Sequence, residues 1–236
     1  MKYLLYKKEH RLFVVLTSLF MLTGYNTIYE WGKENFKQAS RHDENFVKKA
    51  KSFIRSVNVY NGFTVEAHFH TMLLTDEARN LYIDYHAKNR GLNIEQVKTL
   101  KARQANENKN FISMYVVAWK RDRDFVTSKS LFTGEGLKTG NILKGEDALW
   151  NVSLVVGGKR YLPEAVKVVD MPIEYQMFFG ENLNIYNTTY LVRFSAKDHE
   201  GNYIFPQDKT TAIIDFCSPR YRVQTVYKGI NFYLRS

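Results

Sequence analysis

The stretch Phe111-Ile-Ser-Met-Tyr-Val-Val-Ala-Trp119 decides the fold, because eight of its nine side chains are apolar or aromatic. A continuous apolar run of this length predicts a central strand that is covered on both faces. The segments on either side of it should then supply the rest of the sheet and the layers that cover it.

Strand patterns continue from this run to the C-terminus. Leu149 to Val156 reaches Gly157-Gly158 and resumes at Lys159, which predicts a two-residue hairpin turn. Later strand candidates between turn residues are Ala165 to Val169, Thr189 to Ala196, Thr211 to Cys217, Tyr221 to Tyr227 and Ile230 to Leu234. Sixteen Tyr and sixteen Phe against four Pro also favour strands. This spacing predicts an antiparallel β-sandwich of about seven to nine strands.

An N-terminal helix and a strand are expected before the central strand. From Ser40, which suits an N-cap, apolar residues recur at helical spacing from Phe46 to Val57. One packed face and one solvated face explain this helix better than binding to a membrane surface. After Asn61-Gly62, apolar and polar residues alternate from Phe63 to His70, as they do in a half-buried strand.

A helical hairpin is expected as an insertion at about residues 75–109. Thr75 suits the cap of its first helix, which stops near Gly91, and Asn93 with Gln96 suits the cap of its second. The predicted fold is therefore mainly β within the α+β class: an antiparallel β-sandwich with an N-terminal helix and a helical-hairpin insertion.

Composition and charge exclude several classes of protein. With 236 residues, 44% of them hydrophobic, the chain is expected to bury one core. Cys217 is its only cysteine, so no intramolecular disulfide forms, and this thiol is interpreted as a small buried hydrophobe. The net charge is +10, but the basic residues are scattered as pairs such as Lys159/Arg160 and Arg220/Arg222. This pattern favours a solvated basic face over a nucleic-acid site, and leaves attraction to anionic lipid or an acidic polymer open.

The N-terminus has the layout of an export signal. Residues 1–11 are basic, and Leu12 to Leu22 are mostly apolar. A membrane-spanning helix needs about 20 apolar residues, so cleavage is favoured and an uncleaved signal anchor is the alternative. We expect a signal peptide or anchor over 1–24, a lead-in over 25–39 and one β-rich domain over 40–236.

The end of this segment, Leu22-Thr23-Gly24-Tyr25, resembles the lipobox of bacterial lipoproteins, in which a Cys follows the small residues. In that family the Cys thiol receives the lipid, and the Tyr25 phenol cannot replace it. One base change converts a Cys codon into a Tyr codon. With its helical lead-in, helical pair and strands, the chain looks like the uncharacterised lipoproteins of Gram-negative bacteria. The resemblance implies export and periplasmic exposure, and supplies no activity.

One group of three residues suggests a metal site. Glu66, His68 and His70 alternate along the predicted strand, so they share one face, and imidazole with carboxylate is a ligand set for zinc. His86, His199 or Asp198 could supply a further ligand. Alternation alone predicts a solvated polar face, and this is the favoured interpretation.

Other sequence features favour structural roles. Arg121-Asp122-Arg123-Asp124 is interpreted as a solvated turn, and the glycine-rich stretch from Thr133 to Glu146 as a loop at one end of the sandwich that suits recognition. Trp119 and Trp150 lie in apolar strands and are expected in the core. The chain carries none of the common catalytic motifs, which lowers the expectation of an enzyme.

Three functions follow as hypotheses. The first is a non-catalytic exported envelope protein that acts through protein contacts, without a cofactor. The second is a binding module for carbohydrate or an anionic envelope component, which would use the glycine-rich loop and the basic pairs. The third is a metal-dependent hydrolase built on Glu66, His68 and His70.

Overall fold

The computed structural model describes residues 44–120, 142–144, 148–184, 186–205, 210–230 and 232. The chain divides into two compact units, Met1–Glu44 and Asn45–Ser236. All described residues belong to the second unit except Glu44, the first residue of helix α2. No helix among the described residues is long and apolar enough to span a bilayer.

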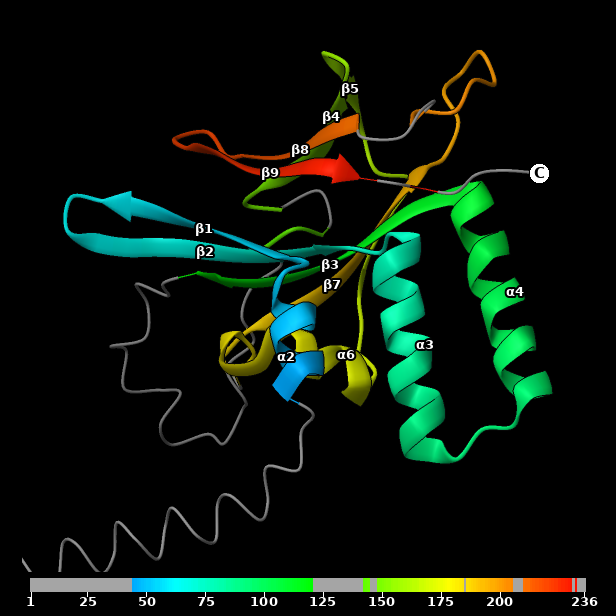
Figure 1. The fold of residues 1–236 in the computed structure, drawn as a ribbon. Helices are drawn as coiled ribbons and strands as arrows, with labels where there is room; N and C mark the ends of the chain where they lie inside the picture. The colour runs from blue at the N-terminus through cyan, green and yellow to red at the C-terminus, as the bar shows by residue number, and fades with distance from the viewer. Residues whose placement is uncertain are drawn as a thin grey trace, which may run out of the picture. The chain divides into compact units, whose positions relative to one another are not determined.

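Two antiparallel sheets form the centre of the second unit (Figure 1). Sheet A contains, in spatial order, β1 (Ile54–Asn61), β2 (Thr64–Leu73), β3 (Phe111–Lys120), β7 (Thr188–Ser195) and β6 (Ala165–Val168). Sheet B contains β5 (Lys159–Tyr161), β4 (Asn151–Val156), β8 (Thr210–Cys217) and β9 (Arg222–Ile230). Nine strands in the described ranges, all paired antiparallel, confirm the predicted mainly β architecture.

The main core lies between the two sheets. Every second residue of β3, from Ile112 to Ala118, is buried in it, and sheet B contributes residues such as Leu154 and Ile214. Thr71 of β2 also meets Tyr227 of β9 here, with their hydroxyl oxygens 2.7 Å apart. Alternation along the strands thus supplies one inward face from each sheet.

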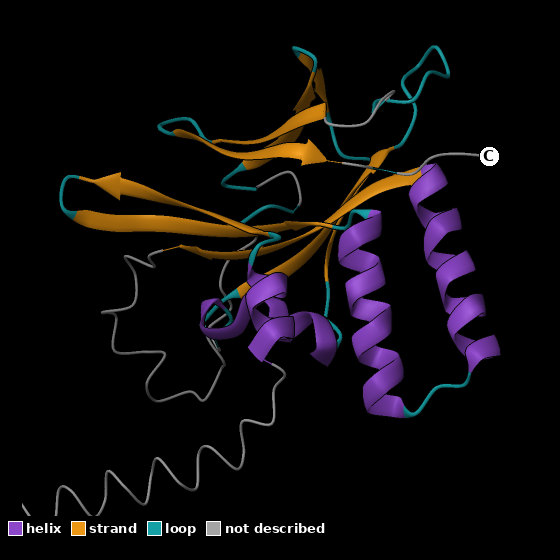
Figure 2. Ribbon diagram, viewed as in Figure 1, coloured by secondary structure: helices purple, strands orange, loops and turns teal. Residues whose placement is uncertain are grey.

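A helical layer covers the other face of sheet A (Figure 2). It consists of α2 (Glu44–Lys51), α3 (Asp76–Arg90) and α6 (Ile173–Phe179), which is followed by a short 3-10 turn, η2 (Gly180–Asn182). Tyr115 and Val117 of β3 pack in a second core cluster with Phe178 of α6 and Phe46 of α2. Strand β3 is therefore covered on both faces, as its apolar run predicts.

The helical-hairpin prediction is confirmed. Helix α3 begins after Thr75, whose hydroxyl accepts a hydrogen bond from the Ala78 backbone, and ends at Gly91 with φ +63°. Helix α4 (Ile94–Asn110) begins with the reciprocal capping box of Asn93 and Gln96. These caps could be recognised from sequence because each is a local hydrogen-bonding pattern.

The expected helix from Ser40 to Val57 is wrong in its second half. Helix α2 ends at Lys51, and strand β1 begins at Ile54. β1 pairs along its whole length with β2, so β-branched residues that also fit a helical spacing fill a strand instead. Residues 40–43 lie outside the described ranges.

Two further differences concern the second half of the chain. β9 runs from Arg222 through Lys228-Gly229 to Ile230, so these two residues are not the expected turn between separate strands. Helix α6 was not predicted, because it has seven residues and Pro172 at its N-cap gives no side-chain cap. The Gly157-Gly158 turn is confirmed, with φ +56° and +79°, as a type I′ hairpin requires.

Candidate functional site

The β1–β2 hairpin extends beyond the strand next to it. Among the described residues β2 pairs with β3 from Ala67 to Leu73, and beyond this stretch Val65 and Thr64 pair with Tyr60 and Asn61 of β1. Gly62 and Phe63 make the two-residue turn, and Gly62 has φ +60°. Glycine adopts a positive φ without strain, and both favoured types of two-residue hairpin turn need one at their first position. The turn therefore lies at the end of a two-stranded arm (Figure 1).

Two large aromatic side chains are exposed at this turn. The relative exposure of Phe63 is 109%, and that of Tyr60 is 56%. We call residues 60–63 the aromatic tip. Burial in the fold does not explain an aromatic ring left wholly in water, whereas aromatic residues are enriched in protein interfaces. The aromatic tip is therefore the strongest candidate for a contact surface.

The expected strand from Phe63 to His70 begins one residue later in the structure, because β2 starts at Thr64. Phe63 shares the two-residue period of Ala67 and Phe69, which fits a strand. The pairing of β2 with β1 nevertheless begins only at Thr64. Asn61-Gly62 was recognised as punctuation, and this dipeptide is also a hairpin signal. Reading it as a hairpin turn would have placed Phe63 directly after the turn, one residue from its position in the structure.

His68 and His70 lie on one face of β2, but the pairing with β1 shifts by one residue at Glu66, which interrupts the alternation expected to place Glu66 beside them. Glu66 Oε1 accepts a hydrogen bond from Asn61 Nδ2 at 3.3 Å instead. The rings of the two histidines are 4.9 Å apart, and Trp119 of β3 stacks on His68 at 5.2 Å. Ser56 Oγ lies 2.7 Å from His70 Nδ1. The favoured interpretation of a solvated face is wrong for His70, which is only 9% exposed, and His68 is half-buried.

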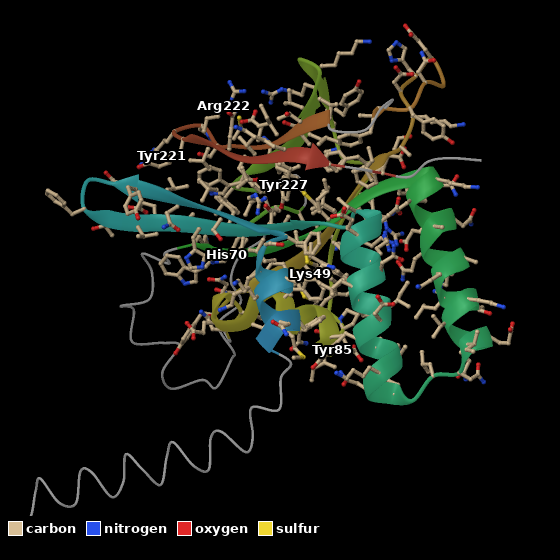
Figure 3. The ribbon with its side chains drawn as sticks, viewed as in Figure 1. Lys49, His70, Tyr85, Tyr221, Arg222 and Tyr227 are labelled. Carbon is tan, nitrogen blue, oxygen red and sulfur yellow. The ribbon has the colours of Figure 1, made fainter. Side chains whose placement is uncertain are left out.

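Burial determines the charge of both imidazoles. It lowers the pKa of His68, and burial with the neighbouring His68 lowers the pKa of His70 to about 4. Both rings are neutral at pH 7, as a metal ligand must be. Figure 3 shows His70 on the side of sheet A that faces away from Tyr227 and the core between the sheets.

The further ligands suggested for this face lie elsewhere. His86 Nδ1 is 2.8 Å from Glu174 Oε1, between α3 and α6. His199 is exposed beside Glu200, and Asp198 accepts backbone hydrogen bonds in its own turn. In the described ranges, no group of three or more His, Cys, Asp or Glu side chains is placed to hold a metal ion. The metal hypothesis stays a prediction.

One residue from each of two basic pairs converges on Asp215 in sheet B. Arg160 Nη2 is 2.6 Å and Arg222 Nε is 2.8 Å from its carboxylate, and Gln224 donates a further hydrogen bond. Burial alone would raise the pKa of Asp215, but the hydrogen bonds from Arg222 and Gln224 and the charges of the two arginines lower it. These arginines are therefore already engaged by a buried carboxylate.

Two other predicted residues have structural surroundings. Cys217 is half-buried, with Sγ 3.7 Å from Asp215 Oδ2. Trp150 is in the core, as expected, against the edge of Phe69. Trp119 is half-buried on His68 and does not lie in the core between the sheets.

The remaining predicted segments lie largely outside the described residues. These are Leu22, Thr23, Gly24 and Tyr25, the Arg121–Asp124 turn and most of the glycine-rich stretch. Within that stretch Ile142 and Leu143 are described and buried, and the Ile142 backbone donates to the Tyr190 hydroxyl at 3.1 Å. These two residues pack in the core, and the prediction of a recognition loop for the rest of the stretch lies outside the described ranges.

Comparisons with protein-family models, curated proteins and solved structures gave no significant match to this chain.

Proposed function

We propose that this protein is a non-catalytic exported envelope protein that acts through protein contacts made by its aromatic tip. The full exposure of Phe63 at the end of a two-stranded arm carries this proposal. Aromatic side chains that bury a large area dominate the energy of many protein interfaces. An apolar pocket on a partner protein is the complementary surface.

Charge favours a protein partner over a membrane surface. From Ser56 to Glu66 the hairpin contains no Lys or Arg, and Glu66 is its only charged residue. Binding to anionic lipid draws on basic residues near the inserted aromatic groups. The tip lacks them, so lipid would have to bind through Tyr60 and Phe63 alone.

Charge also disfavours the anionic-polymer alternative. Arg160 and Arg222, the basic residues that sheet B brings together, both pair with the buried Asp215. A polymer would have to compete with this carboxylate for the same guanidinium groups. The aromatic tip requires no such competition.

The export part of the proposal is supported by the N-terminal sequence. Residues 1–11 are basic, Leu12 to Leu22 are mostly apolar, and Leu22-Thr23-Gly24 resembles a lipobox without its Cys. Intact mass of the protein from separated membrane and periplasmic fractions tests it. A full-length mass in the membrane indicates an anchor, and a mass beginning near Tyr25 in the periplasm indicates cleavage. Recovery from the cytoplasm alone would contradict export.

Site-specific photo-crosslinking tests the aromatic tip. We would replace Phe63 with benzoylphenylalanine in the full chain, expressed in cells, and place the same group at Leu162 as a control. Leu162 is an apolar residue that is 73% exposed outside the hairpin. We expect one discrete protein adduct from position 63 and not from 162. The partner identified by mass spectrometry should then bind the purified Phe63→Ser variant at least about tenfold more weakly.

Three results would contradict this proposal. Equal adducts from positions 63 and 162 would show non-specific proximity. A phospholipid adduct without a protein adduct would assign the tip to a membrane. Unchanged partner affinity after Phe63→Ser would remove the aromatic tip from the interface.

A further inference from the structure

A network of charges joins the base of the helical hairpin to sheet A. Arg79 of α3 and Arg193 of β7 both bind the carboxylate of Glu107 on α4, at 3.2 and 2.5 Å. Arg79 is 3% exposed and also donates to the Leu74 carbonyl and to Gln104. Two guanidinium groups thus share one carboxylate, which leaves the trio with a net charge of about +1.

Unpartnered polar atoms are concentrated around this network. The described part of the chain has seven buried side-chain nitrogen or oxygen atoms without a hydrogen-bond partner. Five of them lie here: Arg79 Nη2, Asn108 Oδ1, Ser113 Oγ, Tyr175 OH and Arg193 Nε. Folded proteins pair nearly all buried polar groups, so a cluster of five indicates a common partner.

These five atoms belong to one region of the fold. Ser113 is the direct cross-strand neighbour of Arg193 in the β3–β7 pair. Asn108 follows Glu107 on α4; the residue is 2% exposed, and its side chain donates to Asp76.

Tyr175 belongs to the same region. Its ring lies 5.2 Å from that of Tyr115, which is the next residue after Ser113 on the same face of β3. Burial raises the pKa of Tyr175, and the positive charge of Arg79 acts against this increase. The hydroxyl is therefore within electrostatic range of the guanidinium.

A purely structural role explains only part of the network. The pairing of Arg79, Glu107 and Arg193 fastens the hairpin to the sheet. It leaves the hydroxyls of Ser113 and Tyr175 without a function, although burying an unpaired hydroxyl is unfavourable. Isosteric apolar residues would pack in the same places.

The unpartnered atoms are mostly hydrogen-bond donors. Arg79 Nη2 and Arg193 Nε are cationic donors, and the hydroxyls of Ser113 and Tyr175 donate or accept. The carboxylate of Asp76, which accepts a hydrogen bond from Asn108, balances the excess positive charge of the trio. The two cationic donors and the two hydroxyls still match an oxyanion, which accepts several charge-assisted hydrogen bonds. The side chains of Arg193 and Glu107 are 32% and 27% exposed, so the network reaches the surface. We propose that the base of the helical hairpin binds a small oxyanion, a carboxylate or a phosphate group, through Arg79, Arg193, Ser113 and Tyr175.

Anion titration of the purified full chain tests this site. The probes are sodium acetate and sodium phosphate, each titrated at constant ionic strength with chloride as the balancing ion. We expect one of them to raise the Tm of the wild type saturably, because a ligand that binds only the folded state stabilises it. Calorimetric titration gives the Kd, and the better of the two anions distinguishes a carboxylate from a phosphate ligand.

Two variants remove single hydroxyls without emptying the site. Ser113→Ala and Tyr175→Phe should each weaken the Kd about tenfold, as expected for losing one hydrogen bond to a charged group. Without anion, their Tm should equal or exceed that of the wild type, since each removes a buried group that has no partner. Tyr227→Phe is the matched control: its hydroxyl is bonded to Thr71, so its Tm should fall while its Kd stays unchanged.

Three outcomes would overturn the proposal. The first is a Tm that neither acetate nor phosphate changes at constant ionic strength. The second is anion binding that Ser113→Ala and Tyr175→Phe leave intact, which would show an adventitious ion only. The third is a loss of stability in both variants without anion, which would mean that these hydroxyls already have partners within the protein. The photo-crosslinking result does not depend on any of them.

Discussion

Phe69 of β2 and Phe216 of β8 stack across the two sheets, with ring centroids 4.2 Å apart and planes 7° apart. Both side chains are fully buried, so each sheet contributes half of this contact. Phe216→Ala should lower the free energy of unfolding by about 3–5 kcal/mol, because it removes buried aromatic surface and leaves a cavity. Urea denaturation measures the change.

Phe63→Ala is the control for this prediction, since the same side chain is fully exposed at the aromatic tip. It should change the unfolding free energy by no more than about 0.5 kcal/mol. Equal losses from Phe63 and Phe216 would mean that the tip packs within the fold, which would contradict its assignment as a contact surface.

Asp215→Asn should destabilise the protein at neutral pH and lose this effect in acid. The variant keeps the shape of the side chain but weakens its charge-assisted hydrogen bonds with Arg160 and Arg222, at a cost of about 1–3 kcal/mol. The pKa of Asp215 is lowered in the fold. Its stabilising contribution is therefore present above the unfolded pKa, about 3.9, and disappears as pH falls through the lower folded value.

Parallel urea titrations of the wild type and Asp215→Asn from pH 7 to pH 2 measure this difference. Glu95→Gln serves as the control, because Glu95 pairs with Lys98 on the exposed surface of α4 and should contribute less than about 0.5 kcal/mol. A difference between wild type and Asp215→Asn that persists undiminished at pH 2 would contradict a lowered pKa.

Because of His70, the free energy of unfolding should fall as pH decreases from about 6.5 to about 4. Burial and then the neighbouring His68 lower its pKa to about 4, whereas an unfolded histidine titrates near 6.5. Between these pH values the imidazole binds a proton in the unfolded chain but not in the folded protein, so the unfolding free energy decreases as pH falls. His70→Gln should reduce the slope of the unfolding free energy against pH by up to about 1.4 kcal/mol per pH unit.

Proton NMR of the imidazole ring measures the titration of His70 directly. Its resonance should move with a midpoint near pH 4 in the folded protein. A midpoint near 6.5 would show that water reaches the ring, and the interpretation of a buried neutral pair would be wrong.

Removal of metal should leave the protein unchanged. The neutral imidazoles of His68 and His70 lie together on this face of β2, and in the described ranges no group of three His, Cys, Asp or Glu side chains is placed to hold a metal ion. Two ligands do not complete a zinc site, which needs three or four. Dialysis against EDTA should not change the Tm, and elemental analysis should find less than about 0.1 equivalent of zinc. Stoichiometric zinc with a Tm that falls on chelation would revive the hydrolase hypothesis.

Local patterns in the sequence predicted the parts of this fold that local interactions define. Thr75, Gly91 and Asn93 satisfy backbone groups within a few residues, so the ends of α3 and the start of α4 followed from them. The apolar run of β3 predicted a strand covered on both faces. It did not predict which elements would cover it, because β2 and β7 reach β3 from distant positions in the chain.

The choice between helix and strand at residues 53–57 required information from elsewhere in the chain. Ile54 and Val57 fit a helical period after Phe46, and pairing with β2 decides the matter. β-branched residues at 54, 57 and 59 were the local signal that could have favoured a strand.

The oxyanion site was missed for a similar reason. Arg79, Glu107 and Arg193 come from three separate elements, and no spacing rule connects them. The available signal was a polar residue between apolar ones, such as Ser113 in the apolar β3 and Arg193 between Val192 and Phe194 of β7. Polar residues inside apolar strands are therefore the positions to examine first in chains of this kind.

Helix α4 is attached to the rest of the fold mainly through polar groups. Asn108 is its buried residue, and Gln104, Glu107 and Asn108 all contact polar groups of α3 or β7. A segment held by few apolar contacts opens at a lower free-energy cost than the core. Backbone amides of α4 should accordingly exchange with deuterium through opening of this helix alone, long before those of β3, and an anion bound at its base would slow that exchange.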